Sequence, residues 1–340
     1  MKYYISIIIS IISFSCNSKN IFQDYEIKQA VTFKTTTELS GQKTNLSPEG
    51  ILALNFIDSL IIVQQKKMSD YIAVYEKKSW HKLKTLLPKG RGPNEFRDFT
   101  FGGQYMKKKH ETAIYFSDIN QGNLYMLNLT KSLQEDSLNI KCISKIPYRS
   151  YPTFLTDSFY ISKTYIPEKK ELSFLLHDTL ARPIDKYLIY ESINFTRYNQ
   201  INSADQIKPD LSKIAMAMFM FNQINILDLH KKHSFSITTS KGSTWLSERY
   251  IENHEPILYY IDLKCTDEKI YALYVNQKIS EWQRVEKPIE IHIFNWEGEP
   301  LYKLKIKESL RNFDIDENNK KLYGLATQEE IFEYDIKEYI

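Results

Sequence analysis

The chain has 340 residues, of which 42% are hydrophobic and 26% charged, and 45 basic and 42 acidic residues give a formal net charge of +3. This near-balance argues against a nucleic-acid partner, which normally meets a concentrated basic face. The length allows two average domains or one large all-β domain. The aromatic content of 14% favours strands. Because only 10 residues are glycine, we expect Asn and Asp to supply much of the turn chemistry.

The N-terminus has the layout of an export signal. Met1 and Lys2 form a short positive region, residues 3–14 are mainly apolar, and Ser15 precedes Cys16. A membrane span needs about 20 apolar residues. The shorter run therefore fits the core of a signal peptide.

The end of this signal resembles a lipoprotein signal, in which the cysteine thiol receives a diacylglycerol. The resemblance implies lipidation of Cys16, although Ser13 stands where such signals prefer Leu. Ordinary cleavage that leaves a free cysteine is the alternative. With lipidation, residues 1–15 are the signal, 16–24 a tether and 25–340 one folded domain, and two acyl chains anchor it stably. In some lineages an acidic cluster after the cysteine directs lipoproteins to the cell surface, and the absence of one after Cys16 favours a periplasm-facing location. We expect the anchor to lie in the outer membrane of the cell envelope.

Short strand patterns follow one another from residue 25 onwards, and no Pro-, Gly- or Ser-rich linker divides them. Residues 25–39 predict one strand, and 51–63 predict two strands around a turn at 57–59. Later segments alternate apolar and polar residues, as 289–293 do, which is typical of strands. Residues 210–221 are the best candidate for a helix, but Met alternating with small or aromatic residues favours a buried strand. The basic run 107–109 is interpreted as a solvated hairpin tip.

The strands group into about six units of roughly 40–50 residues, a length typical of a four-stranded propeller blade. The last unit, from residue 313, is short of strands, while the strand at 25–39 has no neighbour. We therefore predict an all-β fold, a six-bladed β-propeller of four-stranded antiparallel blades. An N-terminal strand would complete the C-terminal blade and close the ring, which removes an exposed sheet edge.

Three stretches resemble segments of bacterial six-bladed propellers of the TolB-like and NHL-like kind. Residues 90–96 (GRGPNEF) resemble a G-x-G-P-x-E-F segment between blades, and 117–127 (SDINQGNLYML) are similar to a D-x-x-N strand pair. Residues 208–215 (KPDLSKIA) resemble an S-P-D-G-x-x-I-A blade start, with Leu211 where Gly is usual. Together with the lipoprotein signal, the chain resembles TolB-like propeller lipoproteins. This resemblance implies a fold and no established reaction.

The segment 90–96 also has a direct physical interpretation. Gly90 and Gly92 can adopt positive φ, and Pro93 fixes a turn without needing a donor. The segment is not a phosphate loop, because it lacks the Lys-Ser/Thr ending and no helix pattern follows.

Its remaining side chains are expected to organise a blade junction. Phe96 would fill the wedge between neighbouring blades, and Glu95 and Arg91 would pair or bond to backbone amides. Turn residues and one apolar anchor are enough to explain the residue types of this segment. The functional alternative is a ligand-contact loop at the mouth of the central channel.

Other candidate residues carry weaker signals. His230 and His233 are the only close histidine pair, and zinc would need more ligands, so no metal or cofactor is predicted. Cys142 and Cys265 are interpreted as buried thiols, although a disulfide is allowed. Trp245 lies in a polar context and is a candidate exposed binding aromatic, as is Trp282.

Carboxylates do not single out a catalytic centre. No G-x-S-x-G motif is present, and Asp118, Asp157, Asp262 and Glu290 are interpreted as surface or turn residues.

The leading hypothesis is a membrane-anchored, non-enzymatic binding or scaffold module for an envelope protein, peptide or glycan. A carbohydrate hydrolase or lyase with its site in the central channel is the alternative, and a purely architectural role is a third. Several carboxylates and histidines within hydrogen-bond reach at the channel mouth would favour the enzyme.

Overall fold

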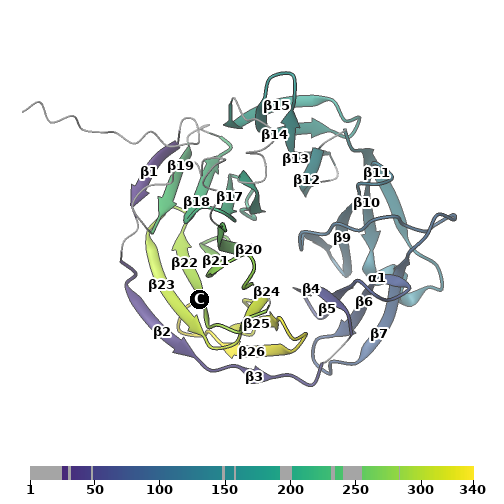
Figure 1. The fold of residues 1–340 in the computed structure, drawn as a ribbon. Helices are drawn as coiled ribbons and strands as arrows, with labels where there is room; N and C mark the ends of the chain where they lie inside the picture. Colours follow the sequence, from purple (N-terminus) through teal and green to yellow (C-terminus); the bar gives the residue numbers. More distant parts are fainter. Residues whose placement is uncertain are drawn as a thin grey trace, which may run out of the picture.

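Six β-sheets are arranged around a central axis in the computed structural model (Figure 1). The structure describes residues 25–29, 32–46, 49–147, 150–156, 158–191, 201–230, 234–239, 255–282 and 284–340. The predicted fold class is confirmed, because the sheets are the blades of a six-bladed propeller and most of them are four-stranded and antiparallel. In the described residues, no helix is long and apolar enough to cross a membrane.

The strands follow one another along the chain within each blade. Blade 1 consists of β4 (Ile51–Ile57), β5 (Leu60–Gln65), β6 (Asp70–Glu76) and β7 (Lys82–Pro88). Blade 2 consists of β8 (Tyr105–Lys108), β9 (Glu111–Asp118), β10 (Asn123–Asn128) and β11 (Ile140–Lys145), with helix α1 (Leu129–Gln134) before β11. Blade 3 consists of β12 (Ser150–Leu155), β13 (Phe159–Ile166), β14 (Glu171–Asp178) and β15 (Pro183–Tyr190).

The second half of the ring repeats this order. Blade 4 consists of β16 (Ser203–Ile207), β17 (Lys213–Met218), β18 (Gln223–Asp228) and β19 (Ser234–Thr238). Blade 5 consists of β20 (Ile257–Cys265), β21 (Lys269–Lys278), β22 (Ile289–Asn295) and β23 (Pro300–Ile306). Blade 6 begins with β24 (Leu310–Asp316), β25 (Lys321–Ala326) and β26 (Ile331–Asp335). In Figure 1, β4, β12, β20 and β24 lie toward the centre of the ring.

The N-terminal segment closes the ring from outside. The short β3 (Gln42–Lys43) pairs antiparallel with β26 and completes blade 6, so closure by an N-terminal strand is confirmed. The closing strand is not the one expected in 25–39. The segment 25–39 contributes differently from the single strand expected there. Its β1 (Tyr25–Gln29) pairs parallel with β19, and its β2 (Thr35–Leu39) pairs parallel with β23. Blades 4 and 5 therefore have five strands, and β19 and β23 are no longer edge strands.

Apolar side chains from neighbouring blades form the core. On β17, Ile214, Met216 and Met218 are buried against residues of blade 3, while Ala215 and Ala217 pack toward blade 5. Both faces of this strand are thus covered, and the strand predicted within 210–221 is confirmed. The basic run 107–109 ends β8 and enters the turn before β9, as a hairpin tip does.

Turn chemistry differs partly from the expectation. Eleven described non-glycine residues have positive φ, but only Asp58, Asn94 and Asn276 among them are Asp or Asn. Many Asp side chains act instead as acceptors for backbone amides. Asp178, for example, accepts from the amides of Leu180 and Arg182, both at 2.9 Å.

Candidate functional site

The loop between β7 and β8 lies at the junction of blades 1 and 2. The backbone closes it, because Gly90 N donates to Phe96 O at 3.0 Å and Phe96 N donates to Pro88 O at 2.9 Å. Inside the loop, Glu95 Oε2 accepts from Gly92 N at 2.6 Å. The prediction that Glu95 bonds to a backbone amide is therefore confirmed, whereas no ion pair joins Glu95 to Arg91 among the described residues.

The two loop glycines serve a purpose other than the predicted one. Neither Gly90 nor Gly92 has positive φ; Asn94, at φ 61°, is the left-handed residue of this loop. A Cβ on Gly90 would lie 1.9 Å from Glu95 Oε2, and a Cβ on Gly92 would lie 3.1 Å from it. The glycines are needed because the carboxylate of Glu95 occupies the space that their side chains would fill.

Phe96 is the apolar anchor of the loop. Its side chain is 3% exposed. Its ring meets the rings of Phe116 and Tyr125 edge-on, with centroid distances of 5.5 and 5.4 Å. Residues of both blade 1 and blade 2 belong to this cluster, so the predicted place of Phe96 between blades is confirmed.

Two hollows, each of about 490 Å³, lie beside this loop. They share Arg91, Phe96, Arg97 and Asn120, and we call the two together the junction site. The first hollow is further lined by Gly92, Asn94, Glu95, Gln121, Asn123, Tyr125 and Ile140. The second is further lined by Tyr71, Lys89 and Gly90. Since Tyr125 and Ile140 come from the outer strands β10 and β11, the site lies away from the channel mouth that the functional alternative invoked.

Asp118 organises the far side of the junction site. Its carboxylate accepts from Arg97 N through Oδ2 and from Gln121 N through Oδ1, both at 2.8 Å. Its side chain is fully buried, so Asp118 is not a surface carboxylate. Its interpretation as a turn residue is confirmed by the hydrogen bond from Gln121 N. Asp118 binds the loop of blade 1 to the β9–β10 turn of blade 2. The stretch similar to D-x-x-N, in which Gln121 stands where the pattern has Asn, was its sequence signal, since an Asp that accepts from the third following amide starts such a turn.

Lys89 and Tyr71 form the opposite end of the site. Lys89 Nζ donates to Gln65 O at 3.0 Å and to Lys66 O at 2.7 Å, and lies 4.8 Å from the centre of the Tyr71 ring. Burial lowers the pKa of Lys89, and burial together with the negative charges of Asp98 and Asp118 raises the pKa of Tyr71. Sequence reasoning missed both residues, because neither lies in a recognisable motif.

The chain after the junction site bends into the ring. Thr100 and Ser117 exchange backbone hydrogen bonds, and Tyr115 N donates to Gln104 O, so the intervening residues bulge away from β9. There Gly102 O accepts from Gln206 Nε2 of blade 4 at 3.1 Å. Gly103 has φ 85°, and a Cβ on it would lie 2.8 Å from Asn55 Nδ2 of blade 1. The bulge thus lies against the inner strand of blade 1 and is hydrogen-bonded to the inner strand of blade 4.

Carboxylates on the inner strands hold neighbouring blades together. Asp262 Oδ2 of β20 accepts from Asn312 Nδ2 at 2.7 Å and from Phe313 N at 3.1 Å. Asp314 Oδ2 of β24 accepts from Phe56 N of β4 at 2.7 Å. The interpretation of Asp262 as an ordinary surface carboxylate is therefore wrong.

Lys264 balances these two carboxylates. Burial alone would lower its pKa, but the negative charges of Asp262 and Asp314 outweigh this effect and raise it. The pKa of Asp314 is raised by burial, and the positive charge of Lys264 opposes that shift.

Glu290 belongs to a second polar cluster, which is formed in blade 5 by side chains of β20, β22 and β23. Its Oε2 lies 2.8 Å from His292 Nε2 and 3.1 Å from Lys303 Nζ, and His292 Nδ1 lies 3.2 Å from the hydroxyl of Tyr260. Burial alone would raise the pKa of Glu290, but His292 and Lys303 lower it to about 2. Glu290 is three-quarters buried, so its interpretation as a surface carboxylate is also wrong.

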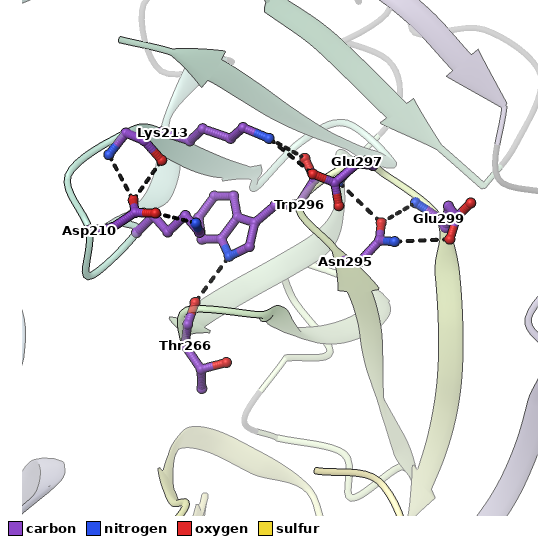
Figure 2. Close-up of polar contacts among 9 residues, drawn as sticks. Asp210, Lys213, Thr266, Asn295, Trp296, Glu297 and Glu299 are labelled. Atoms are coloured by element: carbon purple, nitrogen blue, oxygen red, sulfur yellow. Dashed lines mark hydrogen bonds and ion pairs between the residues drawn. The ribbon is translucent and has the colours of Figure 1, made fainter. Parts of the chain in front are cut away.

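The third motif forms a turn that ties blade 4 to blade 5 (Figure 2). Leu211, which stands where Gly is usual, has φ 63°. Asp210 beside it accepts from Ser212 N at 2.9 Å. Lys213 Nζ donates to Trp296 O at 3.1 Å, and the indole of Trp296 donates to Thr266 O at 3.0 Å. These contacts explain the motif as a structural device.

Several predicted residues lie outside the described part of the chain: Cys16, Asp157, His233 and Trp245. Trp282 is half-buried and packs against the core between blades 5 and 6, so it is not the open aromatic surface that its polar context indicates. His230 is exposed in a turn. In the described residues, no group of three or more His, Cys, Asp or Glu could hold a metal ion.

The two described cysteines are free thiols. Cys265 is half-buried, and burial raises its pKa. Cys142 is exposed, so its interpretation as a buried thiol is wrong. It lies on β11, the outer strand of blade 2, where one face of the strand meets solvent.

A family model, described as TolB-like 6-blade propeller-like, matches residues 53–318, which is more than half of the chain. The chain belongs to this family. The match contains the junction site and all three motifs that carry the resemblance. No curated protein matches the chain.

Two solved structures are similar to this TolB-like propeller. An exported protein of Bacteroides fragilis is 12% identical with a TM-score of 0.55, and covers 91% of this chain and 98% of its own. A member of the DUF4221 family from Bacteroides vulgatus is 11% identical with a TM-score of 0.59, and covers 88% of this chain and 98% of its own. At this identity, the two structures support the fold alone.

Proposed function

We propose that this TolB-like propeller is an exported, lipid-anchored binding module of the cell envelope. Export and lipidation are supported by the N-terminal sequence, in which a charged residue, an apolar run and a small residue precede Cys16. In addition, a protein of similar structure is described as an exported protein. The periplasmic side of the outer membrane remains the proposed location. Replacement of Cys16 by Ser should move the protein from the membrane to the soluble fraction. A Cys16→Ser protein that stays in the membrane after a high-salt wash would contradict the anchor.

The junction site is the proposed binding surface. One observation carries this assignment. The two hollows flank the loop between β7 and β8, whose backbone is fixed by hydrogen bonds, and the exposed side chains around it are polar: Arg91, Asn94, Arg97 and Asn120. Fixed backbone with exposed polar side chains is the arrangement that lowers the entropy cost of binding. An envelope protein, a peptide or a glycan remain the candidate partners.

A binding role is favoured over catalysis because the carboxylates on the inner strands, next to the channel, already bond to groups of neighbouring blades. Asp262 and Asp314 accept hydrogen bonds from backbone amides of adjacent inner strands, and Lys264 compensates their charge. Strand-joining carboxylates of this kind are held in place by the fold and leave few lone pairs for a substrate. The hydrolase or lyase alternative would require a second acid–base pair in the channel.

Site-specific photocrosslinking in intact cells tests the binding surface. A photoreactive amino acid at Asn94, in the first hollow, should give a discrete crosslinked product. The same residue at His110 is the matched control, because this exposed position lies at the other end of β9, on the opposite side of blade 2. Equal products from both positions, or a product from His110 alone, would contradict the assignment.

A further inference from the structure

We propose that the junction site binds a ligand that carries more than one oxyanion group, carboxylate or phosphate, through Arg91 and Arg97. This inference rests on the proposed function, since it names the ligand class for the same surface. Both arginines line both hollows, so one ligand that spans the two hollows can reach the two guanidinium groups. Guanidinium groups match the planar geometry of carboxylate and phosphate oxygens.

Acidic groups lie near the site, but none of them forms an ion pair with its arginines in the described residues. Arg91 and Arg97 are exposed, and neither forms an ion pair within the described ranges of the chain. Among the lining residues, Glu95 alone is acidic, and its Oε2 accepts from Gly92 N at 2.6 Å. The adjacent Asp118 is buried, and both of its oxygens accept from backbone amides. The carboxylates are therefore engaged by the loop itself, and the guanidinium groups remain for an external anion.

Neutral donors stand beside the arginines. Asn94 and Asn120 are exposed, and their side chains make no hydrogen bond with the residues that the structure describes. By contrast, Gln121 Nε2 donates to Glu95 O at 3.0 Å, and Asn123 Nδ2 donates to the Tyr125 hydroxyl at 2.8 Å. The site therefore offers two guanidinium and two amide groups, which is a donor-rich set suited to an acceptor-rich ligand.

The aromatic residues of the site do not offer an open ring face for a neutral sugar. The Tyr125 ring stacks on Phe116 and meets the Phe96 ring edge-on. The Tyr71 ring stacks on Phe99 and carries the Lys89 ammonium 4.8 Å from its centre. Because these rings are engaged within the protein, charge and hydrogen bonding are left to select the ligand, and an oxyanion ligand is favoured over a neutral glycan.

Isothermal titration calorimetry of the mature chain tests this inference with three probes: inorganic pyrophosphate, tetragalacturonate and, as the neutral comparison, cellotetraose. We expect at least one anionic probe to bind and cellotetraose not to bind. The Arg91→Gln and Arg97→Gln variants should each weaken binding about 10-fold or more, and the double variant about 100-fold. Binding should also weaken as salt rises, since exposed charges are screened.

The Arg284→Gln variant is the matched control. It removes the same charge from an exposed arginine outside the site, and binding should be unchanged. Binding of pyrophosphate alone identifies phosphate as the ligand group, and binding of tetragalacturonate alone identifies carboxylate. Absence of binding by both anions, equal binding of cellotetraose, or equal affinities of the wild type and the double variant would overturn the inference. A specific crosslink at Asn94 combined with any of these results would leave the proposed function standing and remove only the oxyanion ligand.

Discussion

Gly90→Ala perturbs the junction loop at the point where its packing is tightest. The added Cβ would lie 1.9 Å from Glu95 Oε2 and 2.5 Å from Glu95 Cδ, so the carboxylate must move and its 2.6 Å hydrogen bond with Gly92 N must break. A hydrogen bond to a charged group contributes about 1.5–3 kcal/mol. Replacement of Gly by Ala returns about 0.4–1 kcal/mol through the unfolded chain. We expect a net loss of about 1 kcal/mol in the free energy of unfolding.

Urea denaturation of a double-mutant cycle with Glu95→Ala isolates this cause. In the Glu95→Ala protein the obstructing carboxylate is absent, so Gly90→Ala should become neutral or slightly stabilising. Gly102→Ala is the matched control, because no atom lies within 4 Å of the added Cβ. If Gly90→Ala costs the same with and without Glu95, the steric explanation for this glycine is refuted.

Three further predictions concern the blades and their turns. Phe96→Ala should lower the free energy of unfolding by about 3–5 kcal/mol, because it leaves a cavity in the core between blades 1 and 2; urea denaturation measures this loss. Leu211→Gly should raise the free energy of unfolding by about 0.5 kcal/mol in the same urea assay. The left-handed backbone costs a non-glycine residue about 1–2 kcal/mol, and Gly removes this cost. The greater freedom of Gly in the unfolded chain offsets part of the gain. Glu290 has a folded-state pKa of about 2, below its usual pKa near 4.5. Ionised Glu290 therefore contributes about 3 kcal/mol to the free energy of unfolding above pH 4.5, and this contribution is lost as the pH falls toward 2. Glu290→Gln should reduce this acid dependence in denaturation measured over a range of pH.

Each of these predictions has a contradicting outcome. A Phe96→Ala protein within 1 kcal/mol of the wild type would show that the ring is not part of the core. A Leu211→Gly protein of lower stability would show that Leu211 contributes more by packing than its backbone costs. An unchanged pH profile in Glu290→Gln would exclude its carboxylate as a source of acid sensitivity.

The propeller was predictable because its signals are local and repeated. Period-two alternation and turn residues locate most strands, as for β22, where 289–293 alternate along the predicted strand. Closure of the ring by an N-terminal strand could be predicted because the last blade has too few strands in the C-terminal sequence. The division of 25–39 into two outer strands was not predictable, since parallel pairing with β19 and β23 depends on contacts more than 200 residues away.

The site was predictable only in part. The segment 90–96 was recognisable by sequence, and Phe96 and Glu95 take the expected roles. The burial of Asp118 and the blade-joining role of the half-buried Asp262 were not predictable, because both depend on amides from other blades or turns. Tyr71 and Lys89 reach the junction site through the packing of blade 1 against blade 2, which no short motif encodes.

Hydrogen–deuterium exchange of the mature protein, with and without its purified crosslinked partner or an anionic probe that binds, tests the central claim most directly. A ligand at the junction site should slow exchange at amides of residues 90–97 and 120–123 and leave the hairpin tip at 109–110 unchanged. Protection confined to the channel-facing strands β4, β20 and β24, or to the 109–110 tip, would contradict the assignment of the binding surface.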